Sequence, residues 1–120
     1  MMAIWLRIAI VDAVAALGGF ARLHRFIRTI APRRGNGGLP AAEVCAAVDR
    51  AAVFYPRQLL CLKRSAAMTW LLRAHGHPAE LVIGACVTPF LAHAWVEIGG
   101  RVVNDNEPVI RGTYVVLERC

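Results

Sequence analysis

The chain has 120 residues, 58% of them hydrophobic, and a mean hydropathy of +0.49, which excludes intrinsic disorder and suits a single domain with a real core. The formal net charge is +6, but no aromatic residues are interleaved with the arginines as in RNA-binding motifs, so we do not expect nucleic acid as a partner. A chain this apolar has more hydrophobic surface than a small monomer needs, which indicates that part of it contacts a partner.

The pattern at the N-terminus predicts two helices. Apolar residues recur at helical spacing until Gly18 and Gly19 interrupt them, and a second helical run follows until Pro32. We expect an N-terminal helical region over residues 1–40 ahead of a core over residues 41–120, together one compact domain. Arginines border the apolar face of this region: Arg7, Arg22, Arg25, Arg28, Arg33 and Arg34. They suit a solubilising face as well as an anionic partner.

Three uses of this apolar N-terminal face are open: packing on the protein's own core, docking a partner protein, or lying on a membrane surface. The segment 3–21 is nearly long enough to span a bilayer. It contains Arg7 and Asp12, however, and either charge costs roughly 2.5–3.5 kcal/mol at a membrane centre, so a spanning helix is not favoured. Core packing is the first expectation, and docking is the second.

The rest of the chain places helices before strands. Apolar spacing and breakers predict helices over residues 41–53 and 61–76, a strand over 80–86, a hairpin over 90–105 and a last strand over 114–117. This order predicts an α+β fold, in which N-terminal helices precede a small antiparallel sheet. We expect the sheet to pack on the helix that begins at Cys61.

Cys61, at the predicted start of a helix, is the candidate nucleophile. A helix N-terminus carries unpaired N–H groups and partial positive charge, which stabilise a thiolate and bind an oxyanion. A lone cysteine before an apolar helix is more often a small core residue. Here His93 and Asp105 follow along the chain, in the order of a general base and a carboxylate that orients it. The three residues are therefore candidates for one catalytic site.

The turn of the predicted hairpin decides whether His93 and Asp105 lie together. With a two-residue turn, His93 faces Asn106, and Asp105 points to the opposite face of the sheet. A three-residue loop over residues 98–100 places His93 opposite Asp105, and we predict this loop because it also matches side chains across the strands. The matched pairs are Trp95 with Val103 and Glu97 with Arg101. We expect the charged pair to be exposed and to contribute at most ~1 kcal/mol.

The remaining cysteines have structural explanations. Cys45 and Cys86 lie in apolar runs and are expected in the core, whereas Cys120 is expected to be loose. No C-x-x-C pair is present, so zinc has weak support, and we expect no metal or other cofactor. Nothing resembles a secretory signal, so we expect a cytoplasmic protein with reduced thiols.

The run from Cys61 to Asp105 resembles the lasso-peptide leader peptidases, the peptidase half of the split maturation B protein, which have a transglutaminase-like fold related to papain. The shared motifs are, in order, CLxRS, G-x-P-A-x-L-x-I-G, PFxAHAWVE and VND. The resemblance implies that Cys61 is the nucleophile, His93 the general base and acid, and Asp105 the residue that orients the imidazole. The backbone N–H of Cys61, with Gln58 as a second donor, is the candidate oxyanion hole.

The same resemblance implies a cysteine protease that removes the leader from a ribosomally made precursor peptide, so that the core can be threaded into a lasso. It also implies two partner proteins, which are a separate small leader-binding recognition element and an asparagine-synthetase-like cyclase. This sequence has no nucleotide-binding loop, so we expect any use of ATP to belong to another protein.

Two other function classes stay open. Another papain-like or transglutaminase-like enzyme would transfer an acyl group to an amine or hydrolyse the amide of a small substrate. A transglutaminase-like binding module without activity would have the same fold. The presence of all three candidate residues favours an enzyme.

Overall fold

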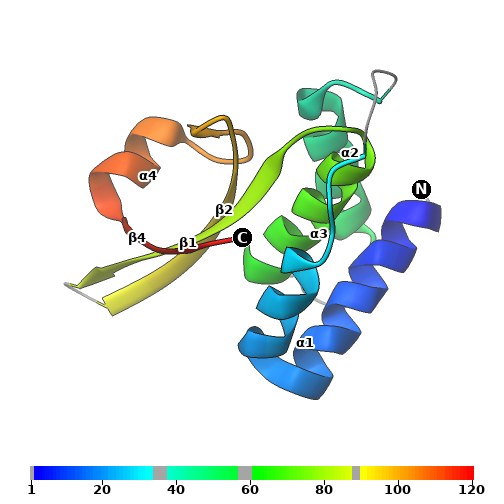
Figure 1. Ribbon diagram of the computed structural model, residues 1–120, viewed down its shortest axis with the longest axis horizontal. Helices are drawn as coiled ribbons and strands as arrows, with labels where there is room; N and C mark the ends of the chain where they lie inside the picture. Colours follow the sequence, from blue (N-terminus) through cyan, green and yellow to red (C-terminus); the bar gives the residue numbers. More distant parts are fainter. Residues whose placement is uncertain (1, 34–37, 57–60, 88–89) are drawn as a thin grey trace.

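A layer of helices packs on one face of a small antiparallel sheet in this computed structural model, which describes residues 2–33, 38–56, 61–87 and 90–120 (Figure 1). The helices are α1 (Met2–Arg28), α2 (Ala41–Val53), α3 (Cys61–Ala74) and α4 (Glu107–Thr113). The strands are β1 (Ala79–Val87), β2 (Phe90–Ile98), β3 (Arg101–Val102) and β4 (Val115–Arg119), in the sheet order β3-β2-β1-β4. The predicted α+β class is confirmed.

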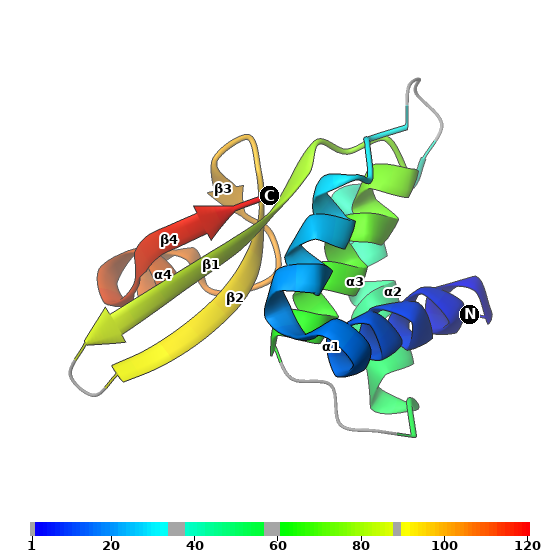
Figure 2. The same ribbon diagram turned by 60° about the horizontal axis from the view of Figure 1, so that its bottom comes forward.

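Helix α1 bends at Gly19, whose φ of 66° lies in the left-handed region that favours glycine. Figure 2 shows its two arms at a steep angle, with the second arm alongside α3. Both arms bury apolar side chains in the core shared with α3, Ile8 and Val11 from the first and Leu23 and Ile27 from the second. The interruption predicted from the Gly-Gly pair is confirmed, and so is core packing of this face.

The outer face of α1 is also apolar. Leu6 is 62% exposed and Leu17 is 83% exposed, although both are large hydrophobic residues. By length and composition alone, Ile4–Arg28 is sufficient to cross a membrane, with a mean hydropathy of 1.8 over an 18-residue window. The docking and membrane-surface alternatives therefore concern these exposed residues, because the inner face is already covered.

Asp12, a charged residue within this apolar helix, lies in the interior and is only 4% exposed. Its carboxylate accepts a hydrogen bond from Nζ of Lys63 at 2.7 Å and one from the hydroxyl of Tyr55 at 3.2 Å. A buried carboxylate needs such partners, since desolvation without them would cost several kcal/mol. The ion pair between Asp12 and Lys63 links α1 to α3 at a position two residues beyond Cys61.

We expect Asp12→Ala to lower the free energy of unfolding by about 1–3 kcal/mol, because Lys63 and Tyr55 both lose this partner. Urea unfolding followed by circular dichroism measures the change. The control is Asp49→Ala, which removes an exposed carboxylate 3.9 Å from Arg64 and should change the free energy by less than about 0.5 kcal/mol. An Asp12→Ala protein as stable as the wild type would show that the buried pair does not stabilise the fold.

Helix α3 is the central helix of the layer. It packs on α1 and α2 through one side and on β1 and β2 through the other. Helix α2 has the predicted bounds, and its Val44 and Val48 meet Met68 and Leu72 of α3 in a buried cluster that also includes Val96 of β2. This packing fixes the start of α3, and therefore Cys61, relative to the sheet.

The hairpin register differs from the prediction. Glu97 pairs with Val102 and Ile98 with Arg101, so the turn contains only the two glycines rather than three residues. Their φ values are 58° and 79°. A two-residue turn with both residues in the left-handed region has a twist that matches antiparallel strands, and glycine adopts it without strain. The predicted three-residue loop, with its matched cross-strand pairs, is therefore wrong.

Glu97 is buried rather than exposed, and its partner is not Arg101. The side chain is 1% exposed, and its carboxylate accepts hydrogen bonds from Nη1 of Arg119 at 2.8 Å and Nε1 of Trp95 at 2.8 Å. Arg101 instead lies 3.1 Å from Glu107. Glu97 therefore connects the hairpin to the last strand, β4, from inside the protein.

Helix α4 has no counterpart among the predicted elements. The side chain of Asn106 caps it by accepting a first-turn backbone N–H at 3.2 Å, and Pro108 stands in that turn. Ile110 packs on Val82 and Trp95, on the sheet face opposite to α1 and α3 (Figure 1). Strand β4 follows, begins one residue later than predicted, and pairs with β1.

Candidate active site

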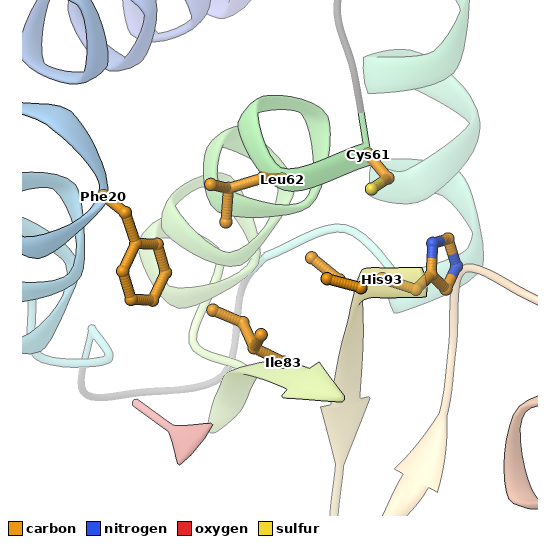
Figure 3. A pocket seen from close by; sticks show the side chains of 7 residues that line it. Phe20, Cys61, Leu62, Ile83 and His93 are labelled. Carbon is orange, nitrogen blue, oxygen red and sulfur yellow. The ribbon is translucent and has the colours of Figure 1, made fainter. Parts of the chain in front are cut away.

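Cys61 and His93 line the same pocket, although they come from different elements. Cys61 is the first residue of α3, and His93 lies in β2. The pocket has a volume of about 250 Å³. Its other lining residues are apolar: Phe20, Leu62, Ile83, Ala92 and Ala94. Figure 3 shows the thiol of Cys61 on the side of the helix start that faces the His93 ring.

The imidazole of His93 is held by two side chains. Its Nε2 lies 2.7 Å from Oδ2 of Asp105, and its ring stacks on Tyr114 with the ring centroids 5.3 Å apart. Burial raises the pKa of Asp105, but hydrogen bonds from His93 and from the backbone N–H of Asn106 outweigh it, so this pKa lies below its usual value. An ionised Asp105 accepts Nε2–H, which leaves Nδ1 as the basic nitrogen.

Asp105 reaches His93 by a different route from the predicted one. In the observed register, a continued strand would place Asn106 opposite His93 and turn Asp105 to the other face. The ladder instead ends at Val103, whose N–H donates to the carbonyl of Val96 at 3.0 Å. The chain then bends and brings the carboxylate back to the imidazole. The predicted contact is confirmed, whereas its predicted cause was wrong.

Two polar residues of the site were missed from sequence, Ser65 of α3 and Asn104 of the bend. They lie within the CLxRS and VND motifs, and their side chains are hydrogen-bonded to each other at 3.2 Å. The available signal was that Ser65 stands four residues after Cys61, on the same helix face. Their meeting could not be predicted, because it depends on the bend.

Of the candidate oxyanion donors, Gln58 lies outside the residues that the structure describes. Cys61 begins α3, and the first N–H groups of a helix have no partner within it. The Cys61 N–H therefore stays a candidate donor. Among the described residues, no group of three or more His, Cys, Asp and Glu side chains is arranged to hold a metal ion.

The other cysteines are not among the residues that line the pocket. Cys45 is buried, as predicted, and burial together with the carboxylate of Asp49 raises its pKa to about 11. Cys86 is half-buried rather than in the core. Cys120 is not loose, because its N–H donates to the carbonyl of Leu81 at 2.9 Å, and burial raises the pKa of its thiol.

We expect iodoacetamide at neutral pH to alkylate Cys61 ahead of Cys45 and Cys120. Cys61 borders the pocket beside His93, whereas the raised pKa values of the other two thiols leave little reactive thiolate. Limited labelling followed by peptide mapping measures the order of reaction. Labelling of Cys45 as fast as that of Cys61 would contradict the assignment of the nucleophile.

Comparison with known proteins identifies the family to which the chain belongs. A sequence profile described as the transglutaminase-like superfamily matches residues 7–119. The chain belongs to the transglutaminase-like superfamily. It is also 47% identical over 45 residues to the microcin J25-processing protein McjB of Escherichia coli. That stretch covers 38% of this chain and 22% of McjB, so the similarity spans about a fifth of that protein. No solved structure matches the chain.

The superfamily assignment confirms the transglutaminase-like fold that the sequence resemblance implied. The matched residues run from the first turns of α1 to the end of β4, so the N-terminal helix is part of the matched fold. McjB is named for processing microcin J25, and its similarity to this chain is partial.

Proposed function

We propose that this chain is a cysteine peptidase that removes the leader from a ribosomally made lasso-peptide precursor. The observation that carries the proposal is the 2.7 Å contact between Asp105 and His93, beside a pocket that Cys61 also lines. A thiol at a helix start, next to an imidazole oriented by a carboxylate, is what nucleophilic catalysis on an amide requires. The partial similarity to a microcin-processing protein supports the same substrate class.

In the first half of the reaction, Asp105 holds the Nε2–H of His93, and Nδ1 accepts the proton of the Cys61 thiol. The thiolate attacks the carbonyl carbon of the last leader residue and forms a C–S bond. The carbonyl oxygen becomes an oxyanion, which the N–H groups at the start of α3 stabilise. The C–N bond then breaks, and His93 gives its proton to the leaving amine of the core peptide.

In the second half, water attacks the thioester that joins the leader to Cys61. His93 accepts a proton from this water and returns one to the sulfur as the C–S bond breaks. The products are the leader with a new carboxylate and the core with a free amine. No cofactor is needed in this proposal, and it includes a cytoplasmic location and two partners, a leader-binding protein and a lasso cyclase.

Acyl transfer is the second candidate function, because the superfamily is named for it. The same thioester would then react with an amine instead of water. The two functions differ in their products, since hydrolysis adds the atoms of water and transfer joins the acyl group to the amine.

Mass spectrometry of a candidate precursor, incubated with the protein with and without a leader-binding protein, tests the proposal. We expect leader and core fragments whose masses together equal the precursor plus water, and faster cleavage when the leader-binding protein is present. An intact precursor under both conditions would contradict the peptidase, and an amine-linked product would favour acyl transfer.

A further inference from the structure

A continuous set of hydrogen bonds links α3, β2 and the bend that follows β3. The hydroxyl of Ser65 donates to the carbonyl of Ala94 at 3.2 Å, and it accepts from Nδ2 of Asn104 at 3.2 Å. On its other side, Oδ1 of Asn104 accepts the backbone N–H of Val96 at 2.8 Å. The two side chains, which we call the Ser65–Asn104 link, therefore bind three separate parts of the chain together.

Each end of this link lies beside a residue of the candidate triad. Ser65 stands one helical turn after Cys61, on the same face of α3. The carbonyl that it contacts belongs to the residue directly after His93 in β2. Asn104 immediately precedes Asp105. Because the triad residues come from these three elements, their relative placement depends on how the elements are joined.

The sheet itself does not hold Asp105 next to His93. Strand β3 is two residues long, and it pairs with β2 only at Glu97 and Ile98. The bend that carries Asp105 leaves the ladder after Val103. The side chain of Asn104 accepts the Val96 N–H that a continued strand would have bound, so it replaces the missing ladder hydrogen bond.

Opening the Ser65–Asn104 link costs free energy because the groups that form it have little access to water. Ser65 is 1% exposed, so its hydroxyl cannot exchange these contacts for water without opening the structure. A hydroxyl has one donor and two lone pairs, and here it both donates and accepts. Opening the link would take one partner from the buried Ser65 hydroxyl and the acceptor from the N–H of the buried Val96, so the intact arrangement is favoured over a loosened one.

We propose that Ser65 and Asn104 are positioning residues that set the placement of the Cys61 thiol, the His93 ring and the Asp105 carboxylate relative to one another. The inference rests on the proposed cysteine-peptidase function. Neither side chain reacts with substrate, and each acts through the backbone segment that it holds. A misplacement of about 1 Å in such a site costs on the order of 100-fold in rate.

Kinetics of precursor cleavage test the inference first. Ser65→Ala and Asn104→Ala should each lower kcat by about 10- to 100-fold and leave KM nearly unchanged, because the reacting groups shift while the peptide-binding surface stays. The kcat of the double variant should be about as low as that of the more impaired single variant, because the two side chains act as one link. Independent, multiplying losses would overturn the inference.

A second readout does not depend on the substrate. NMR of the histidine rings, assigned with His93→Gln, should show in the wild type an Nε2–H proton on His93 that exchanges slowly because Asp105 accepts it. In Ser65→Ala and Asn104→Ala this signal should broaden or disappear. An unchanged His93 signal in both variants would overturn the inference, even in a protein whose precursor is not known.

Thr69→Ala is the matched control. Thr69 is buried in the same helix, one turn beyond Ser65, and its hydroxyl donates to the Ser65 carbonyl at 2.8 Å without reaching β2 or the bend. It should keep kcat and the His93 signal at equal folded concentration. Losses equal to those of Ser65→Ala would show general destabilisation instead. A wild-type protein that cuts no precursor would refute the peptidase, while the ring signal would still decide the positioning role.

Discussion

Cys61→Ala and His93→Ala are each expected to lower precursor cleavage by several orders of magnitude, on the order of 10⁴-fold or more, without unfolding the protein. In the proposed mechanism, Cys61 supplies the electron pair that attacks the carbonyl, and His93 moves the proton in both halves of the reaction. Initial rates followed by mass spectrometry, at matched folded concentration, measure the loss. Asp105→Asn should be less severe, since in the proposed mechanism this residue orients the imidazole and forms no bond to the substrate.

The control for the cysteine is Cys86→Ala, which removes another half-buried thiol that is not among the residues lining the pocket. The control for the histidine is His77→Ala, which removes a ring that contacts the carbonyl of Leu39 and lies outside the site. Both controls should keep most of the activity. Wild-type turnover by Cys61→Ala or by His93→Ala would refute the proposed mechanism.

The largest effect on stability is expected from Glu97. We expect Glu97→Gln to lower the free energy of unfolding by about 2–4 kcal/mol at neutral pH, because it removes the buried charge that binds Arg119 and Trp95. The matched control is Glu80→Gln. The carboxylate of Glu80 is partly exposed and lies 3.9 Å from the same arginine, so this substitution should lower the free energy of unfolding by less than about 1 kcal/mol. Urea unfolding of the three proteins measures both differences.

The loss of stability caused by Glu97→Gln should become smaller at low pH. Burial raises the pKa of Glu97, but hydrogen bonds from Arg119 and Trp95 outweigh it, so its folded-state pKa lies below the ordinary value of 4.5. Because the folded-state pKa is lowered, the ionised carboxylate makes its full contribution to stability above pH 4.5, its ordinary pKa. This contribution is lost as the pH falls through the folded-state pKa. The difference between wild type and Glu97→Gln should therefore shrink in acid, and a constant difference would contradict the buried ion pair.

Local patterns in the sequence were sufficient to predict α1, α2, α3 and most strand positions. Helix α2 has its predicted bounds because Pro40 precedes it and its apolar residues recur at helical spacing. The break at Gly19 was predictable because Gly19 adopts a left-handed backbone conformation, which glycine favours. Helix α4 is only seven residues long, too short to show a clear period, although the Asn106 cap and Pro108 marked its start.

The contacts that complete the site depend on tertiary structure and were less predictable. Side-chain matching favoured the wrong hairpin register, because it could not reveal that Glu97 is buried against Arg119 of a distant strand. The contact between His93 and Asp105 was predicted correctly, yet it arises from a bend that the pairing rules do not describe. The sequence thus indicated the candidate catalytic residues, while the structure was needed to find the contacts between them.

Cleavage of a precursor in water enriched in heavy oxygen tests the central claim most directly. If the chain is a cysteine peptidase that works through a thioester on Cys61, mass spectrometry should find heavy oxygen in the new carboxylate of the released leader, and Cys61→Ala should release no leader. An intact precursor in the presence of its leader-binding protein, or leader released at the wild-type rate by Cys61→Ala, would contradict the claim.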